Sequence, residues 1–235
     1  MHSPRVAEAF AELSTPLLAD ACLRLGAPLR LSPPVIRPLL PASKVAGRVL
    51  PARHYGSVDI FLEAMGAAQP GDVLVVDNAG RLDEGCIGDL IALEAQACGL
   101  AGIIVWGAHR DTADLLRIGL PVFSGGACPA GPQRLDPRHP DALASAQVGE
   151  CAVGRNDVVF ADSDGVLFLA GERVGEVLHT ARAIWRTERA QAEAVRAGKL
   201  LRQQLRFDEY LRRRAVDPSF AFREHLRAIG AAIEV

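Results

Sequence analysis

The sequence predicts an α/β fold built around a central βαβαβ unit. Three short apolar runs, at residues 73–77, 103–106 and 121–123, have the continuous apolar character of strands that are buried on both faces. They alternate with two segments of helical pattern, 89–98 and 112–118, each of which is followed by a glycine. Because strands that alternate with helices are joined by right-handed crossovers, the three strands are expected to be parallel.

The chain before this unit is expected to form a helix, an extended connector, a strand and a second helix. Thr15 as the N-cap followed by Pro16 indicates a helix start, and Gly26 stands where a C-cap glycine would. The proline-rich stretch 31–41 predicts an extended connector. The strand is expected at Val45 to Arg53, the second helix at Ser57 to Ala68, and a turn at Pro70-Gly71.

Three further segments follow from glycine, charge and periodicity. Residues 78–88 are rich in glycine and are expected to form a loop between the first central strand and its helix. Residues 147–169 predict short antiparallel strands separated by Gly, Asn and Asp. From Glu172 onward the pattern is helical, with a break near Asp217-Pro218.

Composition excludes several classes of protein. A formal net charge of −2 and a pI near 6.3 disfavour a dedicated nucleic-acid or anionic-membrane binder. No apolar run reaches the ~20 residues that cross a bilayer, and the first residues lack the apolar stretch of a signal peptide. The five cysteines contain no CxxC pair, which disfavours a disulfide framework or a zinc site. The expectation is a cytoplasmic globular protein in which the arginine-rich stretch 182–214 is a solvated amphipathic helix.

Polar residues are expected to converge where the central strands end. Asp77 ends the first strand, Asp89 begins the following helix, and Arg110 and Asp111 follow the second strand. The loop before Asp89 would let backbone N–H groups approach an anion, and Arg110 suits a carboxylate of the same ligand. Asp89 and Asp111 could hold a divalent cation. Taken alone, Asp89 or Asp111 fits an ordinary helix N-cap better than a ligand.

One long-spaced motif carries a resemblance to a known family. Gly85-x-x-Gly88-Asp89, then twenty residues, then Arg110-Asp111-x-x-Asp114 resembles the signature of the RraA-like family. That family contains regulators of RNase E activity and the class II 4-hydroxy-4-methyl-2-oxoglutarate/4-carboxy-4-hydroxy-2-oxoadipate aldolases. Supporting matches cover residues 14 to 180 in the family's order: Thr15 to Asp20, Gly71 to Asp77, Pro121 to Phe123 and Asp162 to Val166.

The resemblance implies a swivelling β/β/α domain over residues 1–180. The helical extension 181–235 is then expected at a subunit interface of a homotrimer or hexamer, where the family's active sites lie. In the aldolases a C-terminal acidic residue of a neighbouring subunit handles protons, and Glu188, Glu193 and Glu209 are all candidates here.

The resemblance also assigns roles to the motif. It implies that the backbone from Ile87 to Leu90, with Gly85 and Gly88, holds the carboxylate of pyruvate. Arg110 would stabilise the enolate, Asp111 would ligate Mg²⁺ or Mn²⁺, and Asp89 would orient a metal-bound water.

The predicted function is therefore that of a metal-dependent lyase acting on small 2-oxo acids, with oxaloacetate decarboxylation as a related activity. A Schiff-base mechanism is disfavoured because neither of the two lysines, Lys44 and Lys199, is expected at a strand end. The alternative is a non-catalytic regulator that binds an RNA-processing enzyme of the RNase E type. Apolar positions in the C-terminal segment predict an oligomer: Leu200, Leu205, Phe220, Phe222 and Leu226.

Overall fold

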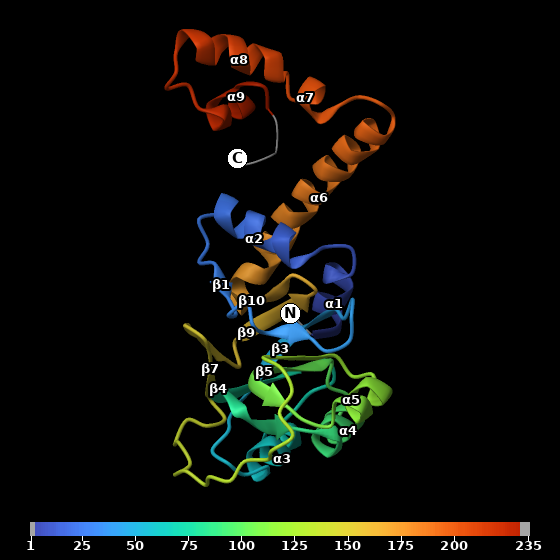
Figure 1. Cartoon of the computed structure of the whole chain (residues 1–235), viewed down its shortest axis with the longest axis vertical. Helices are drawn as coiled ribbons and strands as arrows, with labels where there is room; N and C mark the ends of the chain where they lie inside the picture. Colours follow the sequence, from blue (N-terminus) through green and yellow to red (C-terminus); the bar gives the residue numbers. More distant parts are fainter. Residues whose placement is uncertain (1–2, 231–235) are drawn as a thin grey trace.

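The computed structural model describes residues 3–230 (Figure 1). Its helices are α1 (Ser3–Phe10), α2 (Thr15–Arg24), α3 (Asp59–Gly66), α4 (Asp89–Ala97), α5 (Thr112–Ile118), η1 (Gly171–Arg173), α6 (Val174–Arg196), α7 (Leu201–Gln204), α8 (Phe207–Val216) and α9 (Phe222–Ala228). Its strands are β1 (Arg30–Leu31), β2 (Arg37–Pro38), β3 (Val45–Arg53), β4 (Val73–Ile87), β5 (Gly102–His109), β6 (Val122–Ser124), β7 (Ser145–Val148), β8 (Cys151–Gly154), β9 (Asp157–Asp162) and β10 (Gly165–Ala170).

One strand, β3, joins two halves of an eight-stranded sheet whose order is β1-β10-β9-β3-β4-β5-β6-β2. Residues 45–48 of β3 pair antiparallel with β9, and residues 49–53 pair parallel with β4. The pairs β4–β5 and β5–β6 are also parallel, whereas β1 and β2 add antiparallel edges. The parallel part of the sheet therefore contains one strand more than the predicted βαβαβ unit.

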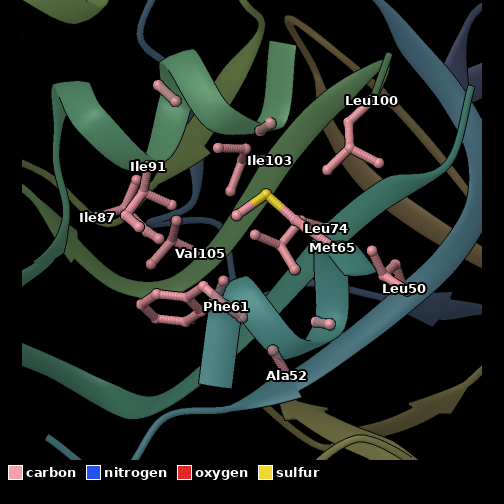
Figure 2. Packing of buried hydrophobic residues seen from close by; sticks show 14 of the residues in the cluster. Leu50, Ala52, Phe61, Met65, Leu74, Ile87, Ile91, Leu100, Ile103 and Val105 are labelled. Atoms are coloured by element: carbon pink, nitrogen blue, oxygen red, sulfur yellow. The ribbon is translucent and has the colours of Figure 1, made fainter. Parts of the chain in front are cut away.

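Three apolar clusters hold these layers together. The first lies between α3–α5 and the half-sheet β3–β6, where Phe61 and Met65 of α3 meet Ile91 of α4 and Ile103 of β5 (Figure 2). The second lies between α1, α2 and α6 and the hairpin β9–β10. The third joins the inner faces of the two half-sheets and takes in the separate hairpin β7–β8. The predicted mixed α/β fold is confirmed.

Most predicted elements match the structure closely. The strand at 45–53 and the helix at 112–118 have the predicted bounds, and the antiparallel strands between 147 and 169 and the break near Asp217 are present. Thr15 is the first residue of α2 and not its N-cap, which is Ser14. The Thr15 hydroxyl and N–H instead donate to the Asp162 carboxylate, at 2.6 and 2.7 Å, which ties α2 to the end of β9.

The predicted loop at 78–88 is wrong, because β4 continues as a strand to Ile87. Beyond Asp77 it pairs with β5 at Arg81, Gly85 and Ile87, with a register shift before each pair. Gly80, at φ +71°, lies so close to Trp106 that an added Cβ would be 2.6 Å from that ring. The bulges and glycines remove the period-2 pattern from the sequence while the strand itself persists.

The C-terminal segment forms an arm that leads away from the body (Figure 1). Val174 to Ile184 bury one face of α6 against the body, and the boundary expected after residue 180 falls inside this helix. Beyond α6, the rings of Phe207, Tyr210 and Phe222 contact one another, and Leu226 is buried. Several apolar positions that predicted an oligomer thus cover each other within the arm. Across residues 3–230, no helix combines the length and apolar character needed to cross a membrane.

Candidate functional site

The candidate site lies where β4 ends and α4 begins. Gly88 is the N-cap of α4, with an extended backbone at φ −133° and ψ −169°, and Asp89 is the first helical residue. The first N–H groups of a helix have no carbonyl partner within it, and they attract anions. Here the Leu90 N–H donates to Asp89 Oδ1 at 2.7 Å, and the Leu90 side chain is largely exposed.

Arg110 and Asp111 stand directly after β5, at the start of α5. The Arg110 N–H donates to the Ile87 carbonyl at 2.8 Å, which fixes the two strand ends side by side. Asp111 is the N-cap of α5 in a left-handed conformation, φ +58° and ψ +40°, that aspartate adopts more readily than most residues. Its Oδ2 lies 3.4 Å from Arg110 Nε, and the two side chains are 37% and 47% exposed.

The two motif glycines make room for this pair. A Cβ atom added at Gly88 would lie 2.4 Å from Asp111 Oδ2 and 3.2 Å from Arg110 Nε. A Cβ atom added at Gly85 would lie 2.6 Å from the Cys128 carbonyl oxygen and 2.9 Å from Arg110 Cβ. The structure therefore brings Gly85, Gly88, Arg110 and Asp111 together where β4 and β5 end.

Asp77 does not join this group. Its carboxylate accepts from Arg53 Nε at 3.0 Å and from the backbone N–H groups of Ala79 and Gln147, at 3.0 and 3.1 Å. The predicted convergence is wrong for this residue because β4 runs ten residues further before it reaches Ile87. Asp77 instead lines an open pocket of about 370 Å³ beside the end of β3 and the middle of β4 and β5.

The side chains of His109 and Cys86, close to the site in sequence, are buried. His109 Nδ1 lies 2.7 Å from Ser124 Oγ and Nε2 lies 3.0 Å from Thr112 Oγ1, while burial lowers the pKa of the imidazole. Burial raises the pKa of the Cys86 thiol to about 12, so it remains protonated at neutral pH. His109 is therefore a neutral structural residue, and Cys86 has none of the thiolate character of a nucleophile.

Sequence reasoning missed a buried polar network beside the site. Arg134 donates to Glu84 Oε1 from Nε and Nη2, at 3.1 and 2.9 Å, and to Asn78 Oδ1 at 2.8 Å. Asn78 Oδ1 also accepts from His54 Nδ1 at 2.8 Å, and burial lowers the pKa of His54. Glu84 and Arg134 are 50 residues apart, and Arg134 lies in a stretch with no periodic pattern, so no signal in the sequence joins them.

The residues present fit a metal ion that keeps much of its water. Among residues 3–230 no three His, Cys, Asp or Glu side chains gather as a ligand cluster. Asp111 and Asp89 offer carboxylate oxygens, which are hard donors, and Mg²⁺ is commonly held by one or two carboxylates with water in its other positions. Because the Asp111 carboxylate is partly exposed, water has access to it.

Comparison with known families gives a match over most of the chain. The family described as "RraA-like: Aldolase/RraA" matches residues 15–168, which include every residue of the candidate site.

Two curated proteins show the range of relatives. A protein of Halalkalibacterium halodurans named "Putative 4-hydroxy-4-methyl-2-oxoglutarate aldolase" is 29% identical over 164 residues, which cover 68% of this chain and 76% of that protein. Protein DlpA of Legionella pneumophila is 32% identical over 133 residues, which cover 56% of this chain. The matched region is only 21% of the Legionella protein, so most of that protein has no counterpart here.

Two solved structures share the fold. An uncharacterized protein from Pseudomonas syringae has a TM-score of 0.75 at 25% identity, with 85% of this chain and 96% of that chain covered. Streptomyces coelicolor RraAS2, described as an unusual member of the RNase ES inhibitor RraA protein family, has a TM-score of 0.70 at 25% identity, with 80% and 96% covered.

Proposed function

Because this chain belongs to the RraA-like family, we propose that it is a lyase that cleaves a carbon–carbon bond of a small 2-oxo acid and releases pyruvate. The observation that carries the proposal is the meeting of Gly88, Arg110 and Asp111 at the start of α4. The aldolase name of the Halalkalibacterium relative supports the same reaction class. The substrates expected are 4-hydroxy-4-methyl-2-oxoglutarate and 4-carboxy-4-hydroxy-2-oxoadipate, with oxaloacetate as a decarboxylation substrate.

The substrate carboxylate is proposed to bind at the backbone from Ile87 to Leu90. Helix-start N–H groups favour negative charge, and Gly85 and Gly88 let the backbone approach a ligand closely. Arg110 then places its guanidinium beside the 2-oxo oxygen, where negative charge grows as the bond breaks and the enolate forms. Stabilisation of developing charge by a fixed donor is commonly worth ~10²-fold or more in rate.

Asp111, with Asp89 acting through a water molecule, would hold Mg²⁺ or Mn²⁺ at the same position. Such an ion, when bound, acts as a Lewis acid on the 2-oxo group. Neither lysine of the chain is placed to form a Schiff base there. Lys44 Nζ donates to the backbone oxygens of Ala11 and Leu13 and lies 4.4 Å from the centre of the Phe10 ring, and Lys199 follows the end of α6.

The C-terminal carboxylates lie far from the site of their own chain. Glu188 and Glu193 are on α6, which leads from the body away from α4 and α5, and Glu209 is on α8 at the opposite end of the molecule (Figure 1). A proton-handling acid from this segment would therefore have to come from a neighbouring copy, in a trimer or hexamer.

The test is pyruvate release from the three substrates, with Mg²⁺, with Mn²⁺ and after removal of metal with EDTA. We expect activity that EDTA abolishes and either ion restores, and no inactivation by borohydride in the presence of substrate. Inactivation by borohydride would show a Schiff base and overturn the metal-dependent mechanism. Absence of turnover with all three substrates and both metals would overturn the lyase assignment.

A second candidate function is regulation of an RNA-processing enzyme without catalysis. The likeness to Streptomyces coelicolor RraAS2, whose description names an RNase ES inhibitor family, favours it. The test measures RNA cleavage by an RNase E-type enzyme with and without this protein. Inhibition that persists in an Arg110→Lys variant, together with a lack of lyase turnover, would put the regulatory function first.

A further inference from the structure

An irregular segment, residues 125–144, connects β6 and β7, and its residues 126–131 form one wall of the candidate site. Three backbone hydrogen bonds hold its first part against the strand ends. The His109 N–H donates to the Gly126 carbonyl at 2.9 Å, the Cys128 N–H to the His109 carbonyl at 2.8 Å, and the Gly85 N–H to the Ala130 carbonyl at 2.7 Å. The segment thus contacts Gly85, which belongs to the site, and His109, which directly precedes Arg110.

The Arg110 guanidinium rests directly on this wall. A Cβ atom added at Gly131 would lie 2.7 Å from Arg110 Nη1, and no other atom except the guanidinium carbon would come within 4 Å. Within the described part of the chain, the ionic partner of Arg110 is Asp111 at 3.4 Å, which is longer than a good charge-assisted hydrogen bond. The position of the Arg110 guanidinium therefore depends on the position of the wall residue Gly131.

Arg134 anchors the wall three residues further on. It makes two hydrogen bonds to Glu84, the residue before Gly85, and its side chain is only 16% exposed, while that of Glu84 is 7% exposed. A carboxylate this deeply buried needs its cationic partner, because an unpaired buried charge is strongly unfavourable. Glu84 and Arg134 therefore hold the wall and the strand end in one arrangement.

We infer that Arg134, through its ion pair with Glu84, is a positioning residue that fixes the wall 126–131 and with it the guanidinium of Arg110. It acts through the wall and has no contact with substrate. This inference rests on the proposed function for its kinetic consequence, but its structural consequence can be measured without turnover.

The first measurement is amide hydrogen exchange in Arg134→Gln and Glu84→Gln variants. We expect the N–H groups of Gly85, His109 and Cys128 to exchange about tenfold faster or more, the range expected for losing hydrogen bonds to a charged group. Arg138→Gln is the matched control, since Arg138 lies in the same segment but pairs with Glu63 at 2.7 Å on the exposed surface. Its exchange at the three amides should equal that of the unaltered protein.

The second measurement is the rate of pyruvate release. In Arg134→Gln we expect kcat and kcat/KM to fall together by about tenfold or more, because a group that acts in the transition state is displaced. Arg134→Lys keeps a positive charge and should restore part of the loss. A Cβ atom added at Gly131 meets the Arg110 guanidinium, so in Gly131→Ala we expect kcat to fall while the exchange rates stay unchanged.

The outcomes separate the two proposals. Exchange rates and kcat in Arg134→Gln that match those of Arg138→Gln would overturn the positioning role. Faster exchange with unaltered kcat would also overturn it, because the wall would then be unimportant for Arg110. If Arg134→Gln does not fold, the exchange rates and kcat of Glu84→Gln decide, because that variant breaks the same ion pair from its other side. Failure of the proposed function would instead appear as no pyruvate from the unaltered protein. In that case two measurements would still decide the positioning role. They are the amide exchange rates, and the rate at which phenylglyoxal modifies Arg110 in Arg134→Gln compared with Arg138→Gln.

Discussion

Replacing Gly88 with alanine adds a single methyl group at the closest point of the candidate site. The added Cβ would lie 2.4 Å from Asp111 Oδ2, which is 1.0 Å short of the 3.4 Å where ordinary contact begins. Asp111 or the α4 start must therefore move by about 1 Å, a displacement that can lower turnover by ~10²-fold when the group takes part in catalysis. The backbone at Gly88 is extended, so alanine introduces no strain of its own.

The assay compares kcat for pyruvate release in Gly88→Ala and Gly66→Ala. Gly66 ends α3, and a Cβ atom added there would meet no atom within 4 Å, which makes it a control for the substitution itself. We expect a ~10²-fold loss in Gly88→Ala, no loss in Gly66→Ala, and melting temperatures close to that of the unaltered protein for both. A Gly88→Ala variant with kcat equal to that of the control would refute a catalytic role for the Gly88–Asp111 contact.

Three further predictions follow from the site and its surroundings. Arg110→Lys loses the planar fork and should lower kcat by ~10²-fold with little change in melting temperature, a result that near-normal turnover would contradict. The activity of Asp111→Ala should no longer respond to added Mg²⁺, whereas Asp114→Ala should keep the response, because Asp114 pairs with Arg117 on the surface. Equal responses of the two variants would argue against Asp111 as the metal ligand. Burial lowers the pKa of His54 and His109 from 6.5, so below that pH the unfolded chain binds protons that the folded chain does not. The free energy of unfolding should therefore fall as the pH drops below about 6.5. Denaturant titrations at about pH 7.5 and about pH 5.5 measure this, and equal stability at both would contradict it.

The sequence was sufficient to predict the fold where periodicity and punctuation agree. The strand at 45–53 is largely apolar apart from its two arginines, and the helix at 112–118 ends at Gly119 in the left-handed conformation that a C-cap glycine adopts. The region from Asp77 to Gly88 could not be predicted in the same way. Bulges there break the alternation of side chains, so a strand had the sequence of a loop.

The site shows the same division. Gly88, Arg110 and Asp111 come together because they stand at the ends of neighbouring parallel strands, and the spacing of the motif encodes those ends. The prediction for Asp77 was wrong because β4 extends to Ile87, whereas the sequence predicted that this strand ends at Asp77. Arg134 could not be predicted at all, because its contact with Glu84 depends on the path of an irregular segment that has no pattern of its own.

The sharing of β3 between two half-sheets has a consequence for how the molecule loses its structure. Residues 45–48 complete the hairpin β9–β10 and residues 49–53 complete the parallel strands, so neither half keeps its full set of ladder hydrogen bonds without the other. The apolar cluster between the halves couples them further, since each half covers the inner face of its neighbour. Denaturation of the body should therefore be a single cooperative transition. The arm beyond α6 has its own small cluster of rings, so we expect it to unfold separately from that cooperative unit.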